Sequence, residues 1–183
     1  MTLVFILLAL LTIVLIVFFF IMSFSVYGWF VASAPFVPVR KHTIQYIIKA
    51  LFLNDTSVLY DLGSGDGIVL HAALKSNPHI HAVGIEIAPF PRILSRIFLM
   101  NYRRRVRIIN ADFYTADFSE ATHIFVYLYD HVLAKLESRF DAQLQKGTRV
   151  VSCDFTFPNK KPIEIIEMKE GRILAKKLYV YIW

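Results

Sequence analysis

The stretch that decides the fold of this chain is Val58-Leu59-Tyr60-Asp61-Leu62-Gly63-Ser64-Gly65-Asp66-Gly67. It is an apolar run that holds one carboxylate and then breaks into three alternating glycines. An apolar segment with helical periodicity follows, so the pattern predicts a strand, a tight loop and a helix whose first N–H groups can bind a ligand. Glycines also let a ligand approach the main chain closely. The stretch predicts a cofactor-binding loop, although a glycine-rich corner can also serve packing alone.

Two carboxylates follow in an order that adds to this interpretation. Glu86 ends the next apolar run, residues 81–86, about 20 residues after the last glycine, and Asp112-Phe113 closes a third run. An acid at the end of the second strand can accept hydrogen bonds from both hydroxyls of a ribose. The glycine spacing differs from the dinucleotide fingerprint G-x-G-x-x-G, which favours another cofactor.

The pattern Asp-x-Gly-x-Gly-x-Gly resembles motif I of the class I S-adenosylmethionine-dependent methyltransferases. The resemblance implies that the cofactor is S-adenosyl-L-methionine, with Glu86 on the ribose and Asp112 on the adenine amino group. The cofactor-binding residues that it implies are Asp61, Gly63, Gly65, Gly67, Glu86, Asp112 and Phe113. The alternative for Glu86 and Asp112 is that each merely ends a strand.

The order of apolar patterns predicts an α/β fold with a doubly wound, mainly parallel sheet and a C-terminal antiparallel hairpin. The resemblance implies that this is a Rossmann-like methyltransferase fold. Strands are expected at 58–62, 81–86, 106–110, 123–129 and 149–154, and the hairpin at 163–168 and 172–183. Helices are expected at 44–51, 68–76, 89–101 and 131–144, with no full helix at 111–122.

The first 22 residues have the pattern of one transmembrane helix in front of this domain. No charged side chain occurs before Arg40, and residues 2–22 form a predominantly apolar run. About 20 such residues cross the ~30 Å hydrocarbon core. We therefore expect an anchor and juxtamembrane linker at residues 1–30, with a linker beginning near residue 23, and a methyltransferase domain at residues 31–183. Since Arg40 and Lys41 are the first charges, the domain is expected on the cytoplasmic side of the membrane, the inner membrane in a bacterium.

A cleaved secretory signal is the competing interpretation of this segment. Ala32-Ser33-Ala34 has the small-x-small pattern of a cleavage site. It fits less well, because the chain has no basic N-terminal region, the apolar stretch is long, and Pro35 would follow the cut.

Composition limits which partners, disulfides and metal sites this chain can have. The hydrophobic fraction is 56% and the net charge is +6, and six arginines lie between residues 92 and 107. This basic cluster suits either anionic lipid headgroups or a solvated helix end. The single cysteine, Cys153, excludes an internal disulfide, and six scattered histidines give a structural metal site no support. Nothing in the sequence resembles a dedicated nucleic-acid fold, so no nucleic-acid partner is expected.

A narrower resemblance spans residues 35–158. Pro35-Phe36-Val37-Pro38, the glycine-rich loop and Gly147 to Phe155 resemble the lysine methyltransferases that modify the ATP synthase c-subunit and the adenine nucleotide translocase. The resemblance implies a protein lysine as acceptor and an extended arm at 35–38 folded over the cofactor. Two departures lie on the acceptor side: a tryptophan expected after strand 149–154 is absent, and little chain remains for a helix before the hairpin.

Tyr129 and Asp154 are the candidate catalytic residues, because they follow the fourth and fifth strands at the edge where an acceptor amine would enter. Strand alternation predicts that Tyr127 faces the same way as Tyr129. Three functions remain open. A membrane-anchored protein-lysine methyltransferase leads, a methyltransferase for a lipid or quinone-like molecule is the alternative, and a non-catalytic module with the cofactor fold is the third.

Overall fold

The computed structural model describes residues 2–31, 39, 41–168 and 176–183. The arm predicted at residues 35–38 lies outside these described residues. The helices are α1 (Thr2–Val31), α2 (Lys41–Leu51), α3 (Ile68–Ser76), α4 (Pro89–Phe98) and α5 (Asp130–Gln143), with a short 3₁₀ turn, η1 (Met100–Tyr102). The strands are β1 (Val58–Leu62), β2 (His81–Ile85), β3 (Val106–Ile109), β4 (His123–Val126), β5 (Arg149–Cys153), β6 (Glu164–Glu167) and β7 (Lys177–Ile182).

The strands form one sheet in the order β3-β2-β1-β4-β5-β7-β6. The pairs among β1 to β5 are parallel, and β7 lies antiparallel between β5 and β6. The predicted doubly wound sheet with a C-terminal hairpin is therefore confirmed. Residues 169–175 of the expected hairpin lie outside the described part. Between β5 and β6 the described residues contain no helix, which agrees with the short stretch of chain available there.

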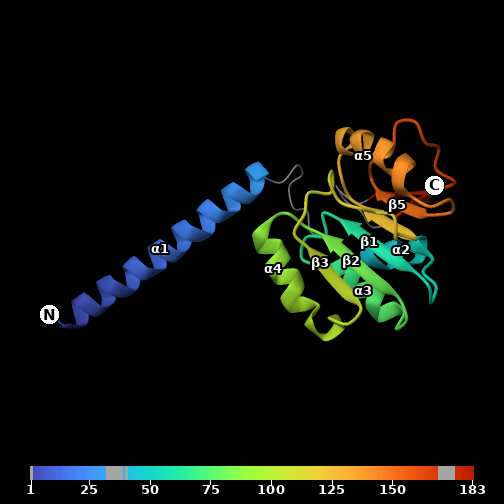
Figure 1. The fold of residues 1–183 in the computed structure, drawn as a ribbon. Coiled ribbons are helices and arrows are strands. Elements are labelled where there is room, and N and C mark those ends of the chain that lie inside the picture. Colours follow the sequence, from blue (N-terminus) through green and yellow to red (C-terminus); the bar gives the residue numbers. More distant parts are fainter. Residues whose placement is uncertain (1, 32–38, 40, 169–175) are drawn as a thin grey trace.

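Helices cover both faces of the sheet (Figure 1). Side chains of α2 and α3 pack with Leu59 and Phe125 in one core, and side chains of α5 pack with Tyr60 and Tyr181 in the other. Since successive side chains of a strand point to opposite faces, Asp61 lies on the α3 side together with Leu59. The strand that carries the first carboxylate is thus buried on both faces.

The fourth strand is shorter than the sequence predicts. Its ladder with β1 and β5 ends at Val126, and Tyr129 is the N-cap residue of α5 with φ −61° and ψ 155°. The chain has to leave the sheet here in order to start the helix. The predicted strand end at residue 129 was therefore wrong, and strand alternation does not relate Tyr127 to Tyr129.

Helix α1 extends away from the domain, and its C-terminal end contacts α4 (Figure 1). The helix continues to Val31, so the residues expected to form a linker from residue 23 are helical as far as Val31. Apolar side chains between Val4 and Phe20 are at least half exposed. Within the described residues, whose α1 side chains run from Val4 to Phe20, no helix is long and apolar enough to cross a membrane.

Gly84 on β2 is a position where the fold tolerates no side chain. A Cβ there would lie 2.6 Å from the Ser64 Oγ and 2.8 Å from the Cδ1 atoms of Leu70 and Ile108. Gly84→Ala should therefore lower the free energy of unfolding by about 1–3 kcal/mol, measured by urea denaturation. Ile108→Val removes one of the three obstructing atoms, so the double variant should lose less than the sum of the single variants. Additive losses would contradict this packing account.

Candidate active site

The candidate site lies at the carboxyl ends of the parallel strands, where the chain turns from β1 into α3 and from β4 into α5. In the sheet β1 lies between β2 and β4, so the connections from these strands leave toward opposite faces. Such a switch point is where open α/β sheets bind ligands. The two loops meet there, because a Cβ at Gly63 would lie 3.5 Å from Leu128 of the β4–α5 loop.

The three glycines of the β1–α3 loop all adopt positive φ, with values of 73°, 54° and 80° at Gly63, Gly65 and Gly67. The amides of Gly63 and Ser64 both donate to the Ile85 carbonyl oxygen, at 2.9 and 3.1 Å. L-residues rarely adopt this conformation, so the loop requires glycine. The sequence-based prediction of a strand, a tight loop and a helix is confirmed.

Gly67 has a second role in packing. It is the N-cap residue of α3, and a Cβ there would lie 2.9 Å from Leu99 Cδ1 and 3.1 Å from Ser95 Cβ. The third glycine therefore lets the end of α4 pack against the loop. The part that the sequence predicts for Gly67 in cofactor binding, a close approach of the ligand to the main chain, stays a prediction.

Glu86 is buried immediately after β2 and holds the loop in place. Its two carboxylate oxygens accept hydrogen bonds from the Gly65 amide at 2.9 Å and the Ala88 amide at 2.7 Å. Burial raises the pKa of Glu86, and the backbone hydrogen bonds partly oppose that shift. Each carboxylate oxygen can accept a second hydrogen bond, so the predicted ribose contact is compatible with this geometry.

Asp61 is a buried carboxyl group without a charge partner. It is 3% exposed, and the described residues provide it with no hydrogen bond or salt bridge. Burial, followed by the negative charges of Glu86 and Asp66, raises the pKa of Asp61 to about 8. The neighbouring Ser64 Oγ is also buried without a hydrogen-bond partner among the described residues. A ligand that brings positive charge and polar groups would complete this part of the site.

Asp112 and Phe113 follow β3 on the same edge of the sheet. One carboxylate oxygen of Asp112 accepts a hydrogen bond from the Tyr114 amide at 2.8 Å, and the side chain is half-buried. The other oxygen is suited to an adenine amino group. The Phe113 ring is 7% exposed and packs in the core against Tyr114 at 4.8 Å between centroids. The contact between Phe113 and the cofactor that the sequence predicts stays a prediction.

The candidate catalytic residues meet through an aromatic cluster formed by Tyr127, Tyr129 and Phe155. The Phe155 ring centroid lies 6.3 Å from that of Tyr127 and 5.1 Å from that of Tyr129. The Tyr127 hydroxyl donates to Asp154 Oδ2 at 3.2 Å. The structure thus brings Tyr129 and Asp154 to one place, together with Tyr127 and Phe155.

Asp154 is held rigidly at the end of β5. It adopts φ 62°, and its Oδ1 accepts hydrogen bonds from the amides of Lys176 at 2.6 Å and Lys177 at 3.1 Å. A non-glycine residue in this region is uncommon, and Asp and Asn tolerate it best. Strained backbone of this kind often marks a functional position. His131, on the first turn of α5, stacks on Tyr129 at 5.9 Å between ring centroids.

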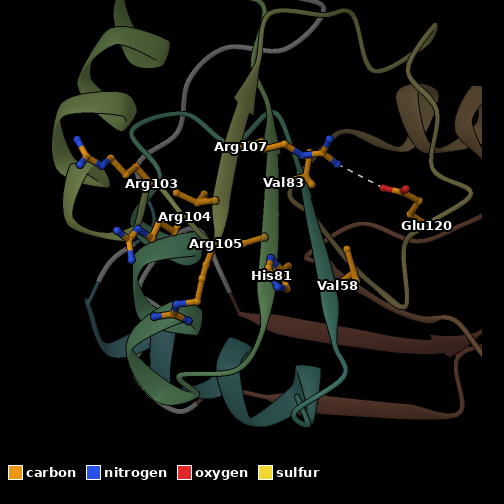
Figure 2. Close-up of a pocket in the computed structure, with 10 residues that line it drawn as sticks. Val58, His81, Val83, Arg103, Arg104, Arg105, Arg107 and Glu120 are labelled. Carbon is orange, nitrogen blue, oxygen red and sulfur yellow. Dashed lines mark hydrogen bonds and ion pairs between the residues drawn. The ribbon is translucent and has the colours of Figure 1, made fainter.

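A second concavity lies at the opposite edge of the sheet (Figure 2). It has a volume of about 450 Å³, and its lining includes the first residues of β1, β2 and β3. Two of its arginines already have partners: Arg105 donates to the Leu74, Asn77 and Ile80 carbonyls, and Arg107 pairs with Glu120 at 3.3 Å. Because the switch point lies at the other end of the strands, this concavity is not the active site.

Comparison with known proteins shows which protein family this chain resembles. Residues 61–164 match the family model of the ANTKMT methyltransferase domain. A protein-lysine N-methyltransferase of Saccharolobus islandicus is 29% identical over 155 residues, which cover 84% of this chain and 96% of that protein. The lysine N-methyltransferase of the ATP synthase c-subunit from Xenopus laevis is 29% identical over 133 residues, covering 72% of this chain and 58% of that protein. The chain thus spans little more than half of this animal relative.

A solved structure agrees with these matches. It is an RNA methyltransferase from Salinibacter ruber in complex with S-adenosyl-L-homocysteine, with a TM-score of 0.73 and 31% identity over 80% of this chain and 93% of that one. The fold and the site therefore define an S-adenosylmethionine-dependent methyltransferase. Within this class, the chain belongs to the ANTKMT methyltransferase domain family.

The cofactor fits the residues present. S-adenosylmethionine carries a sulfonium, an ammonium and a ribose diol, and the site offers buried Asp61, the Glu86 oxygens and a glycine loop that a ligand can approach closely. The sequence located these groups through the motif. It missed Gly84 and Leu128, whose roles depend on contacts between segments far apart in the chain.

Cofactor binding should be linked to the titration of Asp61. Below its pKa of about 8 the free protein holds this carboxyl protonated, and a cationic ligand favours the carboxylate. Binding should therefore release a proton, and affinity should rise by up to about tenfold per pH unit between pH 6 and 8, then level off. Calorimetry in buffers of different ionisation enthalpy measures both effects.

Asp61→Asn should bind weakly and with a flat pH profile. The exposed Asp117, whose pKa Ser119 holds low, supplies the control: Asp117→Asn should keep the wild-type profile.

In the cofactor-free protein the folded pKa of Asp61 lies above the ordinary value of 3.8. The stability that this group contributes at low pH is therefore lost as the pH rises toward 8, and Asp61→Asn should unfold at higher urea than wild type there. If Asp61→Asn kept the wild-type pH dependence of cofactor affinity, the assignment of this titration to Asp61 would be wrong.

Proposed function

We propose that this protein transfers the methyl group of S-adenosylmethionine to the side-chain amine of a lysine in a membrane protein. The observation that carries the proposal is the cluster of Tyr127, Tyr129 and Phe155 around the Asp154 carboxylate at the switch point. Aromatic faces and a carboxylate are what a cationic amine binds. Relatives named as protein-lysine N-methyltransferases support the same acceptor.

The chemistry gives each of these groups a task. The bound cofactor supplies a methyl carbon activated by a sulfonium. The lysine must first lose a proton, which costs about 4 kcal/mol at neutral pH from a pKa of ~10.4. As its nitrogen attacks the methyl carbon, the C–S bond breaks with its electron pair on sulfur, and positive charge develops on nitrogen. Asp154 and the aromatic rings stabilise that developing charge, and water receives the released proton.

Membrane attachment is the second part of the proposal, with residues 1–30 as the anchor and 31–183 as the enzyme domain. It rests on the sequence, in which residues 2–22 are uncharged and continue into residues without charge as far as Val39. The exposed apolar side chains of α1 support it, since burying them requires an apolar surrounding. Arg40 and Lys41, as the first charges, favour the cytoplasmic side for the domain.

The alternative acceptor is a lipid or quinone-like molecule at the membrane, which an anchor would bring to the enzyme equally well. A non-catalytic role is less favoured, because the loop glycines and the acidic residues of the site all occupy the positions that cofactor binding requires. The hydrogen-bonded Asp154 favours a cationic amine over a neutral acceptor.

The nature of the acceptor can be read from where a labelled methyl group goes. The full-length enzyme should be incubated with methyl-labelled S-adenosylmethionine and membranes from cells that lack the gene, and protein, lipid and RNA then separated. We expect the label in a protein, on lysine after hydrolysis. Label in the lipid phase alone would establish the alternative, and label in RNA alone would contradict both.

In the same assay, Asp154→Asn should lower the rate of methyl transfer about 10- to 100-fold, the equivalent of a charge-assisted hydrogen bond of about 1.5–3 kcal/mol. Asparagine tolerates the same backbone conformation and can still accept from the amides of residues 176 and 177, so cofactor affinity should not change. Glu120→Gln, an exposed carboxylate at the opposite edge of the sheet, is the matched control. Equal rates of methyl transfer in the two variants would contradict the proposed role of Asp154.

Attachment can be tested separately. The full-length protein should remain in the membrane pellet after alkaline extraction, with its N-terminal residues still present by mass spectrometry, since an apolar span resists extraction. A reporter fused after Trp183 should behave as cytoplasmic. Release into the supernatant, or an N-terminus created by cleavage after Ala34, would show that the anchor interpretation is wrong.

A further inference from the structure

Helix α4 carries its apolar side chains on the outside of the domain. Phe90, Ile93, Leu94, Ile97 and Phe98 repeat at helical spacing along one face, and each is between 41% and 66% exposed. The residues of the helix that are buried are Pro91 and Ser95. Met100, in the turn that follows, is 62% exposed and extends this surface. We call these six apolar residues the α4 face.

Cations border the α4 face. Arg103 and Arg104 follow it directly and are exposed, and the described residues give neither side chain a hydrogen bond or a salt bridge. Figure 2 shows their side chains pointing outward from the domain, whereas Arg105 turns back toward α3. Arg96 is exposed as well and donates to the Ile108 carbonyl oxygen at 3.1 Å. An apolar helix face beside exposed arginines is the pattern of a helix that lies in a membrane interface.

The position of α4 agrees with this pattern. The C-terminal end of α1 contacts α4 (Figure 1), so a bilayer that holds α1 would bring lipid close to the α4 face. Helix α4 also begins three residues after Glu86 and packs through Ser95 and Leu99 on the glycine loop. A surface that binds α4 therefore lies next to the cofactor site.

From these contacts and exposures we infer that the α4 face docks on the surface of an anionic lipid bilayer, with Arg103 and Arg104 on the headgroups. The inference rests on the proposed membrane attachment and deepens it by giving the domain a fixed orientation. The apolar side chains supply burial at the boundary of the acyl chains, and each arginine near the surface adds attraction to anionic lipid. Tethering by α1 alone would leave the domain free to rotate, whereas a second contact holds the switch point at one height above the bilayer.

The test places a fluorescent label on the full-length protein in nanodiscs of phosphatidylcholine, either alone or with roughly a third of phosphatidylglycerol. Ile97→Cys provides the site, since Ile97 is 66% exposed. The native Cys153 is fully buried, and burial raises the pKa of its thiol, so it should not react. Ser138→Cys on α5, across the sheet, is the control site.

We expect the label at position 97 to shift its emission to the blue and to be quenched by brominated lipid, about twofold or more strongly in anionic than in neutral nanodiscs. The label at position 138 should show neither change. Arg103→Ala with Arg104→Ala should remove the preference for anionic lipid, while Lys146→Ala with Lys161→Ala, two exposed lysines elsewhere, should keep it.

Three outcomes would overturn the inference. A label at position 97 that stays in water in both nanodiscs would exclude docking. A blue shift without lipid that grows with protein concentration would indicate a second copy of the chain on the α4 face. A blue shift without lipid at every concentration would indicate that α1 covers it. None of these readings involves methyl transfer, so a failure of the lysine acceptor would appear in the label fractionation and leave this result unchanged.

Discussion

The structure depends on two buried carboxylates at the ends of neighbouring strands. Asp61 on β1 and Glu86 after β2 lie beneath the glycine loop, and the described residues form a salt bridge with neither. Backbone amides of Gly65 and Ala88 hold Glu86, while Asp61 is left to shift its pKa. A ligand that carries positive charge would offset the cost of burying this group as a carboxylate. The sulfonium cofactor of this family has that property.

The two halves of the active site are built by different means. On the cofactor side, the main chain determines most of the geometry, through positive φ angles and amides that bind Glu86. On the proposed acceptor side, side chains dominate: the rings of Tyr127 and Tyr129 lie against Phe155, and the Tyr127 hydroxyl donates to the Asp154 carboxylate, which amides of the C-terminal hairpin also bind. In the proposed function, specificity for the acceptor therefore belongs to the half that the hairpin completes.

The surface of the protein carries apolar side chains in two places, on α1 and on the α4 face. Apolar side chains of α1 and of the α4 face remain in contact with solvent, whereas the two cores of the domain are closed. An apolar surface that a fold leaves open is a cost unless something covers it. The proposed bilayer would cover both surfaces, which contact each other through α1 and α4 and have arginines beside them.

Sequence alone determined the α/β fold with its mainly parallel sheet, the glycine loop and the positions of the carboxylates Asp61, Glu86 and Asp112. These features depend on local patterns and on a motif with regular spacing. The sequence also indicated the acceptor edge, since Tyr129 and Asp154 follow consecutive strands of a parallel sheet. Only the tertiary structure decided that β4 ends at Val126, that Gly84 leaves room for Ser64 and Leu70, and that Phe155 joins Tyr127 to Tyr129. It also decided that the apolar face of α4 points outward. Helical periodicity shows that a helix has an apolar face, whereas the direction of that face depends on what the rest of the chain packs against it.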